Sequence, residues 1–169
     1  MARNRDGCGP FRFTARMVLP PRAAPQWCMT DTDDVRSLLA VYSESALAKD
    51  VDRFMTIYAD DVRIFDLWGT WQISGVSAWR HGITAWFGSV GDDLVVVDFD
   101  DVAISVGGDL AALTAMIEYS AQNAAGERIR QMANRLTWVL ARTDDSWRVI
   151  HEHTSAPVDD ATGTVILQR

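Results

Sequence analysis

Apolar residues recur every three or four positions in the first half of the chain, which is the spacing of amphipathic helices. A first helix is predicted after the acidic, capping-rich stretch TDTDD, and its apolar face holds Val35, Leu38, Leu39, Tyr42 and Ala46. A second helix is predicted after the capping residue Asp50, with the apolar face Val51, Phe54, Met55 and Tyr58. A third is predicted after the capping residue Ser77, with the apolar face Trp79, Ile83, Trp86 and Phe87.

Strand patterns occupy the rest of the chain. The stretch DVRIFDLW alternates apolar and polar side chains, so that Val62, Ile64, Asp66 and Trp68 share one face of a strand that Gly69 ends. Four long β-rich runs then follow, joined by short turns at GGD, AAGE and DDS. The order predicts an α+β fold, in which a strongly bent, cone-shaped antiparallel sheet is closed by three N-terminal helices.

The last of these strands, WRVIHEHTS, carries two of the three histidines of the chain. Because strand side chains alternate, Trp147, Val149, His151, His153 and Ser155 are expected on one face. Since Trp147 and Val149 resemble core residues, the two imidazoles and the hydroxyl are predicted to point into the cone.

Composition limits the classes of partner. The net charge of −7 argues against nucleic acid, and no apolar run approaches the ~18 residues of a membrane span. Residues 1–28 are basic and rich in Pro and Gly, so they are predicted to be a disordered tail or an upstream extension, with one domain over residues 29–169. Two cysteines at positions 8 and 28 provide no disulfide framework, which is compatible with a cytoplasmic protein.

The order of elements, the stretch YADDVRIFD and the ending WRVIHEHTSAP resemble the SnoaL-like branch of the nuclear transport factor 2-like superfamily. The resemblance covers roughly residues 30–157. That superfamily includes ketosteroid isomerases, polyketide cyclases, limonene-epoxide hydrolase and the association domain of calcium/calmodulin-dependent kinase II. It therefore implies the cone fold, but not one activity, because the fold hosts enzymes, binding modules and assembly domains.

Residue by residue, the resemblance places Asp66 at the proton-shuttling carboxylate of the isomerases and Tyr42 at their oxyanion-stabilising tyrosine. Their second oxyanion donor, a protonated carboxylic acid, falls near Thr137, and Leu67 replaces the proline that follows their base. The residues themselves also favour Asp66 as a base, because apolar neighbours on its strand face raise the pKa of a carboxyl group. The alternatives are a solvated aspartate and an ordinary core tyrosine.

His151 and His153 allow three interpretations: a metal pair, structural histidines, or acid/base and polar anchor groups of a pocket. A metal pair is the least favoured, because the sequence offers no further ligand at suitable spacing. His153 is the preferred catalytic candidate, with His151 and Ser155 as substrate-binding residues.

Arg135 and Thr137 are the corresponding candidates on the preceding strand. If their face is the inner one, the guanidinium can hold a carboxylate or an enolate; otherwise it neutralises a buried acid. In limonene-epoxide hydrolase the corresponding arginine works with an aspartate two residues on, and Thr137 stands there in this chain, so the resemblance to an epoxide hydrolase is weaker.

Seven tryptophans are many for 169 residues. Trp68, Trp71 and Trp86 follow segments that border the mouth of the cone in this family, so they are predicted to line a slot for a flat hydrophobic ligand. No Gly-rich phosphate loop is present, and neither a cofactor nor a metal is expected.

The sequence hence predicts a small-molecule enzyme of the isomerase, cyclase or lyase type that acts on a hydrophobic carbonyl compound. A ligand-binding or assembly module without turnover is the alternative, and an epoxide hydrolase is the third possibility. The stretch TVILQ near the C-terminus is expected to form an additional edge strand, and the resemblance favours a homodimer.

Overall fold

A computed structural model describes residues 27–169, with side chains from residue 31 onward. The predicted tail, residues 1–28, lies outside the described residues apart from its last two. In chain order the described elements are α1 (Trp27–Ala48), α2 (Val51–Met55), β1 (Tyr58–Phe65), β2 (Ile73–Ser74), α3 (Val76–Ser89), β3 (Leu94–Gly107), β4 (Leu110–Gln122), β5 (Arg128–Thr143) and β6 (Ser146–Ser155).

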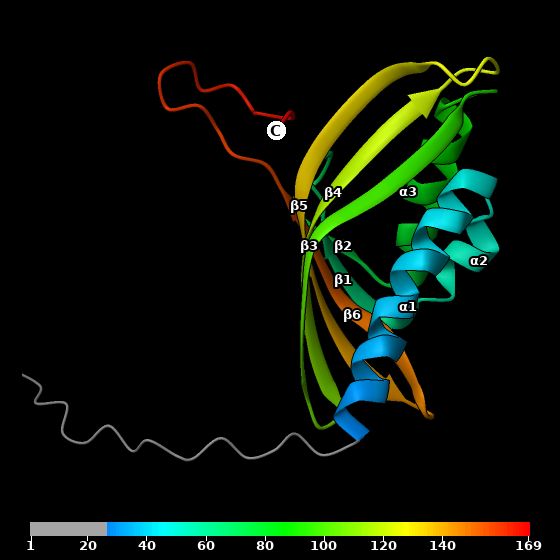
Figure 1. Ribbon diagram of the computed structural model, residues 1–169, viewed down its shortest axis with the longest axis vertical. Helices are drawn as coiled ribbons and strands as arrows, with labels where there is room; N and C mark the ends of the chain where they lie inside the picture. Colours follow the sequence, from blue (N-terminus) through cyan, green and yellow to red (C-terminus); the bar gives the residue numbers. More distant parts are fainter. Residues whose placement is uncertain (1–26) are drawn as a thin grey trace, which may run out of the picture.

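The three helices of residues 27–169 cover one face of a strongly curved sheet (Figure 1). The Asp50 side chain caps α2 as predicted, accepting a hydrogen bond from the Arg53 backbone N–H at 2.9 Å. The cap of α3 is Gly75 rather than the predicted Ser77. Gly75 has a φ of 85°, a conformation that glycine adopts without the strain of a side chain.

The six strands follow the order β2-β1-β6-β5-β4-β3. The strands β3 to β6 form the predicted antiparallel meander, whereas β1 pairs with β6 in parallel, so the complete sheet is mixed. The α+β cone is thus confirmed, and its sheet departs from the expected one in this parallel pairing and in the short strand β2, which pairs with β1. Bulges interrupt the register of the long strands near Asp100, Ala121 and Val139, which is how long strands bend.

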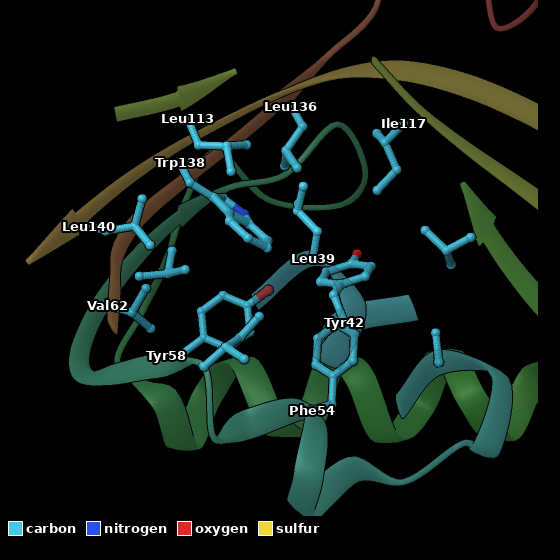
Figure 2. Packing of buried hydrophobic residues seen from close by; sticks show 14 of the residues in the cluster. Leu39, Tyr42, Phe54, Tyr58, Val62, Leu113, Ile117, Leu136, Trp138 and Leu140 are labelled. Carbon is cyan, nitrogen blue, oxygen red and sulfur yellow. The ribbon is translucent and has the colours of Figure 1, made fainter. Parts of the chain in front are cut away.

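The core lies between the concave face of the sheet and the helices. Figure 2 shows Tyr42 of α1 packed on Phe54 of α2. Their ring centroids lie 4.4 Å apart. Trp138 of β5 and Tyr58 of β1 close the same core from the sheet. On α1 and β1 the residues predicted from periodicity to face inward are buried, Leu38 only in part, whereas Tyr58, predicted on the second helix, lies at the start of β1. The apolar core residues of lowest exposure are Val35, Ala46, Phe54, Val62, Ile64, Leu113, Ile117, Trp138, Leu140 and Val149.

The C-terminal segment leaves β6 on the side of the sheet opposite the helices (Figure 1). It forms an isolated bridge between Val158 and Val165, and the Leu167 carbonyl accepts a hydrogen bond from the Ala133 N–H at 2.7 Å. The predicted additional strand over TVILQ is therefore wrong, because this segment makes single contacts rather than a ladder. No helix within residues 27–169 has the length and apolar character needed to cross a membrane.

Candidate active site

A cavity of about 550 Å³ lies between the concave face of the sheet and helix α3. Its wall is largely aromatic, with carboxyl, hydroxyl and amide groups among the rings. The residues that line it include Tyr42, Asp66, Trp68, Trp86, Tyr119, Asn134 and Glu152. A volume of this size suits a small organic molecule.

A bulge in β6 determines which groups of that strand reach the cavity. Val139 pairs with His151 and the next residue of β5, Leu140, pairs with Val149, so Ile150 is an extra residue. The bulge shifts the alternation by one position, and the inward face continues from Val149 to Glu152. An uninterrupted strand would have placed the histidines there.

The two histidines consequently lie on the outer face, and their predicted inward orientation is wrong. His151 Nδ1 donates to the Arg63 carbonyl at 2.9 Å, and both His151 and His153 pack edge-on against Phe65. His153 is exposed. Neither histidine lines the cavity, and the hydrogen bond of His151 to the backbone matches the structural interpretation.

The pairing of β5 with β6 also determines where the candidates Arg135, Thr137 and Ser155 lie. Ser155 pairs with Arg135, and His153 pairs with Thr137, so both candidates on β5 accompany the histidines. The expectation that Arg135, Thr137 and Ser155 face into the cone is wrong, since none of them lines the cavity. On the opposite face of β5, Asn134, Leu136, Trp138 and Leu140 are buried. Over this part of β5 the even-numbered residues are more apolar than the odd-numbered ones, so the sequence did indicate which face of this strand is buried.

Glu152 is the residue that the bulge brings into the core, and its position was not predicted. Its side chain is 1% exposed. Tyr58 Oη and Trp138 Nε1 both donate to its Oε2, at 2.7 and 2.8 Å. Burial raises the pKa of Glu152 to about 7, against the lowering effect of these two hydrogen bonds, and the nearby charge of Asp66 raises it further. Near neutral pH, both charge states of Glu152 are populated.

Asp66 lies just after the end of β1 and lines the cavity, on the face predicted from its alternation with Val62 and Ile64. Burial raises the pKa of its carboxyl group. Hydrogen bonds oppose that effect: Thr154 Oγ1 donates to Asp66 Oδ1 at 2.8 Å, and the backbone N–H groups of Leu67 and Trp68 also lower the pKa. Thr154 itself accepts from the Leu67 N–H at 2.8 Å, which fixes its orientation.

Two tyrosines add hydroxyl groups to the cavity. The hydroxyls of Tyr42 on α1 and Tyr119 on β4 are hydrogen-bonded at 2.9 Å. Burial is the main cause of the raised pKa of each phenol, and the charge of Glu152 raises both pKa values further. Both hydroxyls therefore stay protonated, so each can donate a hydrogen bond. Tyr119 is a second residue that sequence reasoning missed, although it alternates with Leu113 and Ile117.

The predicted tryptophan slot is assembled only in part. Trp68 and Trp86 line the cavity, and Trp86 packs edge-on against Tyr119 with ring centroids 5.6 Å apart. Trp71 is 98% exposed and does not line the cavity. Among the side chains that the structure describes, residues 31–169, no three histidine, cysteine or carboxylate groups lie close enough together to hold a metal ion.

Comparison with known proteins places this geometry in a family. A family model described as SnoaL-like domain matches residues 35–159, which is most of the chain. The chain belongs to the SnoaL-like family. None of the curated proteins compared with it matches.

Solved structures share the fold of this SnoaL-like chain at low identity. An NTF2-like protein of unknown function from Pseudomonas putida has 23% identity and a TM-score of 0.74, over 83% of this chain and 96% of the other. An NTF2-like protein with a cystatin-like fold from Novosphingobium aromaticivorans has 18% identity and a TM-score of 0.69, over 80% and 87%. A proposed NTF2-like dehydratase from Streptomyces avermitilis has 20% identity and a TM-score of 0.64, over 78% and 99%. At these identities the likeness concerns the fold of the SnoaL-like domain.

Proposed function

We propose that this SnoaL-like protein is an enzyme that moves a proton at a carbon next to the carbonyl of a hydrophobic small molecule. The observation that carries the proposal is the meeting of two carboxyl groups with raised pKa values, Asp66 and Glu152, in one aromatic-lined cavity. Carboxyl groups tuned toward neutrality are suited to general acid–base chemistry. The reaction belongs to the isomerase, cyclase or lyase type, and dehydration falls within the same proton-transfer chemistry.

Asp66 is the proposed base. It lines the cavity without a cationic partner among its hydrogen bonds, so its carboxylate keeps the basicity that burial confers. The carboxylate takes a proton from the carbon beside the carbonyl, and an enolate forms as the C–H electron pair moves toward oxygen. Returning the proton to another carbon, or expelling a leaving group from the enolate, completes an isomerisation or an elimination.

The proposed donors to the developing oxyanion are the paired tyrosines and the neutral form of Glu152. In the Tyr42–Tyr119 pair, whichever hydroxyl accepts from the other retains its own proton to donate to the substrate oxygen. Glu152 accepts both its hydrogen bonds at Oε2, so in the neutral acid Oε1 carries the proton. In ketosteroid isomerases a neutral carboxylic acid donates a hydrogen bond to the oxyanion, and the resemblance to them implies such an acid near Thr137. In this chain Glu152 lies close to that position, because it is the register partner of the next residue, Trp138.

The two alternatives are less well supported. An epoxide hydrolase resembling limonene-epoxide hydrolase would use Arg135, which is exposed on the outer face and does not line the cavity. A binding module without turnover would need neither the buried carboxyl group of Glu152 nor the half-buried one of Asp66, whose desolvation costs folding free energy.

Deuterium exchange tests the proposal directly. With 2-tetralone in D₂O, we expect the protein to accelerate loss of the ¹H NMR signals of the carbons beside the carbonyl, relative to buffer at the same pH. A panel of tetralones and cyclic enones extends the test to other ring shapes. If ligands of this kind bind but no panel member exchanges or isomerises faster than in buffer, the binding-module alternative is the correct one.

Thr154→Val is expected to shift the acid limb of the pH–kcat/KM profile upward by about one pH unit. The variant removes a hydrogen bond that lowers the pKa of Asp66, and hydrogen bonds to charged groups are worth about 1.5–3 kcal/mol. Thr137→Val, on the outer face of the neighbouring strand, is the matched control and should leave the profile unchanged. An acid limb that stays in place or moves downward in Thr154→Val would contradict the role of Asp66 as base.

A further inference from the structure

Asn134 is a cavity residue that the proposed proton transfer does not use. It lies on β5 between Met132 and Leu136 on the inward face, and its side chain is 6% exposed. Its Oδ1 is buried and has no hydrogen-bond partner among the residues that the structure describes. Asn134 also lines the cavity.

The surroundings of Asn134 make this unpaired oxygen costly. Its register partner on β4 is Ile117, and the next inward residue on β5 is Leu136, both of which are buried hydrocarbon. A buried acceptor left without a donor loses its hydrogen bond to water and gains none in return, which destabilises the protein without ligand. A ligand that brings a donor to this oxygen removes that cost, whereas a ligand without one leaves it in place.

The position of Asn134 relative to Asp66 indicates where the donor belongs on the ligand. Asp66 is hydrogen-bonded to Thr154, and Thr154 is the register partner of Leu136. Asn134 lies one inward position further along β5, which corresponds to about 7 Å of strand. The donor therefore belongs on a part of the ligand remote from the reacting carbon, such as the far ring of a fused bicyclic compound.

We infer that Asn134 is a specificity-determining residue that accepts a hydrogen bond from a hydroxyl group of the substrate, so the substrate class is a hydroxylated cyclic carbonyl compound. This inference rests on the proposed function for the orientation of the carbonyl at Asp66. Trp68 and Trp86 line the cavity with aromatic rings against which a hydroxylated ring can pack. Asn134, which also lines it, supplies an acceptor oxygen that no described residue uses.

Three matched probes test the inference by isothermal titration calorimetry: 2-tetralone, 6-hydroxy-2-tetralone and 6-methoxy-2-tetralone. The hydroxyl compound can donate, whereas the methoxy compound has similar shape and only accepts. We expect the wild-type protein to bind the hydroxyl compound about tenfold more tightly than either of the others, as one satisfied hydrogen bond of about 1.4 kcal/mol requires. In Asn134→Leu, a variant of similar side-chain volume, the three affinities should agree within about twofold.

The controls separate this inference from the proposed function. Thr137→Val, on the outer face of β5, should keep the wild-type preference. Equal binding of the three probes by the wild type, binding of none of them, or a preference that persists in Asn134→Leu would overturn the role of Asn134; the wild-type selectivity needs no variant to fold. A hydroxyl preference without deuterium exchange would instead refute the proposed function alone, and exchange without the preference would refute this inference alone.

Discussion

Asp66→Asn is expected to lower the rate of deuterium exchange at the carbons beside the carbonyl of 2-tetralone by about 10²–10⁴-fold, because it replaces the proposed base by an amide. The amide has nearly the same shape and can still accept a hydrogen bond from Thr154, which donates to Asp66 Oδ1 at 2.8 Å. Ligand affinity should therefore change by less than about threefold. The measurement pairs exchange by NMR with binding by calorimetry on the same preparations.

Asp61→Asn is the matched control for this experiment. Asp61 lies on the same strand, β1, but is exposed and does not line the cavity. Its variant should exchange at the wild-type rate. His153→Ala should do so as well, because His153 is exposed on the outer face of β6. Wild-type exchange in Asp66→Asn, or a large loss in His153→Ala, would move the chemistry away from this cavity.

Periodicity predicted the architecture because burial follows it on the long elements. The inward residues of α1 and β1, such as Leu39, Tyr42, Val62 and Ile64, are those that repeat at helical or strand spacing. The parallel pairing of β1 with β6 could not be read in the same way, since it joins segments far apart in the chain. Nor could the short contacts of the C-terminal segment, where an apolar run without a paired partner forms only an isolated bridge.

Sequence reasoning predicted the site residues on elements whose buried residues keep a regular spacing. It missed those on β6, where a bulge interrupts the alternation of side chains. Asp66 and Tyr42 line the cavity as expected, because Asp66 continues the alternation of Val62 and Ile64, and Tyr42 continues the helical spacing of Val35 and Leu39. One extra residue, Ile150, exchanges the faces of β6 and replaces the histidines by Glu152 and Thr154. No residue type in that stretch marks the bulge, so sequence alone gives no reason to abandon the regular alternation. On β5, by contrast, the choice of Arg135 and Thr137 overlooked the more apolar parity of Leu136 and Trp138.

The exchange of faces has a thermodynamic consequence, since it puts a carboxyl group rather than an imidazole in the core. Glu152 is buried among Tyr58 and Trp138, and burial raises its pKa from 4.5 to about 7. The folded protein therefore binds a proton more tightly than the unfolded chain does. Wherever the folded state holds more protons, the free energy of unfolding falls as pH rises.

Glu152→Gln is accordingly expected to remove a large part of the pH dependence of stability. The stabilisation from protonated Glu152 is fully present below pH 4.5 and is lost progressively up to about pH 7. At about 1.4 kcal/mol per pKa unit, the loss amounts to about 3 kcal/mol in the wild type. The raised pKa of Asp66 acts in the same direction, so some dependence persists in the variant.

Urea denaturation between pH 4.5 and 8 measures the difference between wild type and Glu152→Gln. The glutamine can still accept from Tyr58 and Trp138, so the two curves should meet at low pH and separate by about 3 kcal/mol above pH 7, with the variant more stable. Glu127→Gln, at an exposed position in the β4–β5 turn, should follow the wild type throughout. Parallel wild-type and Glu152→Gln curves would mean that Glu152 titrates alike in the folded and unfolded chains, and the neutral acid would then be lost as a donor in the proposed reaction.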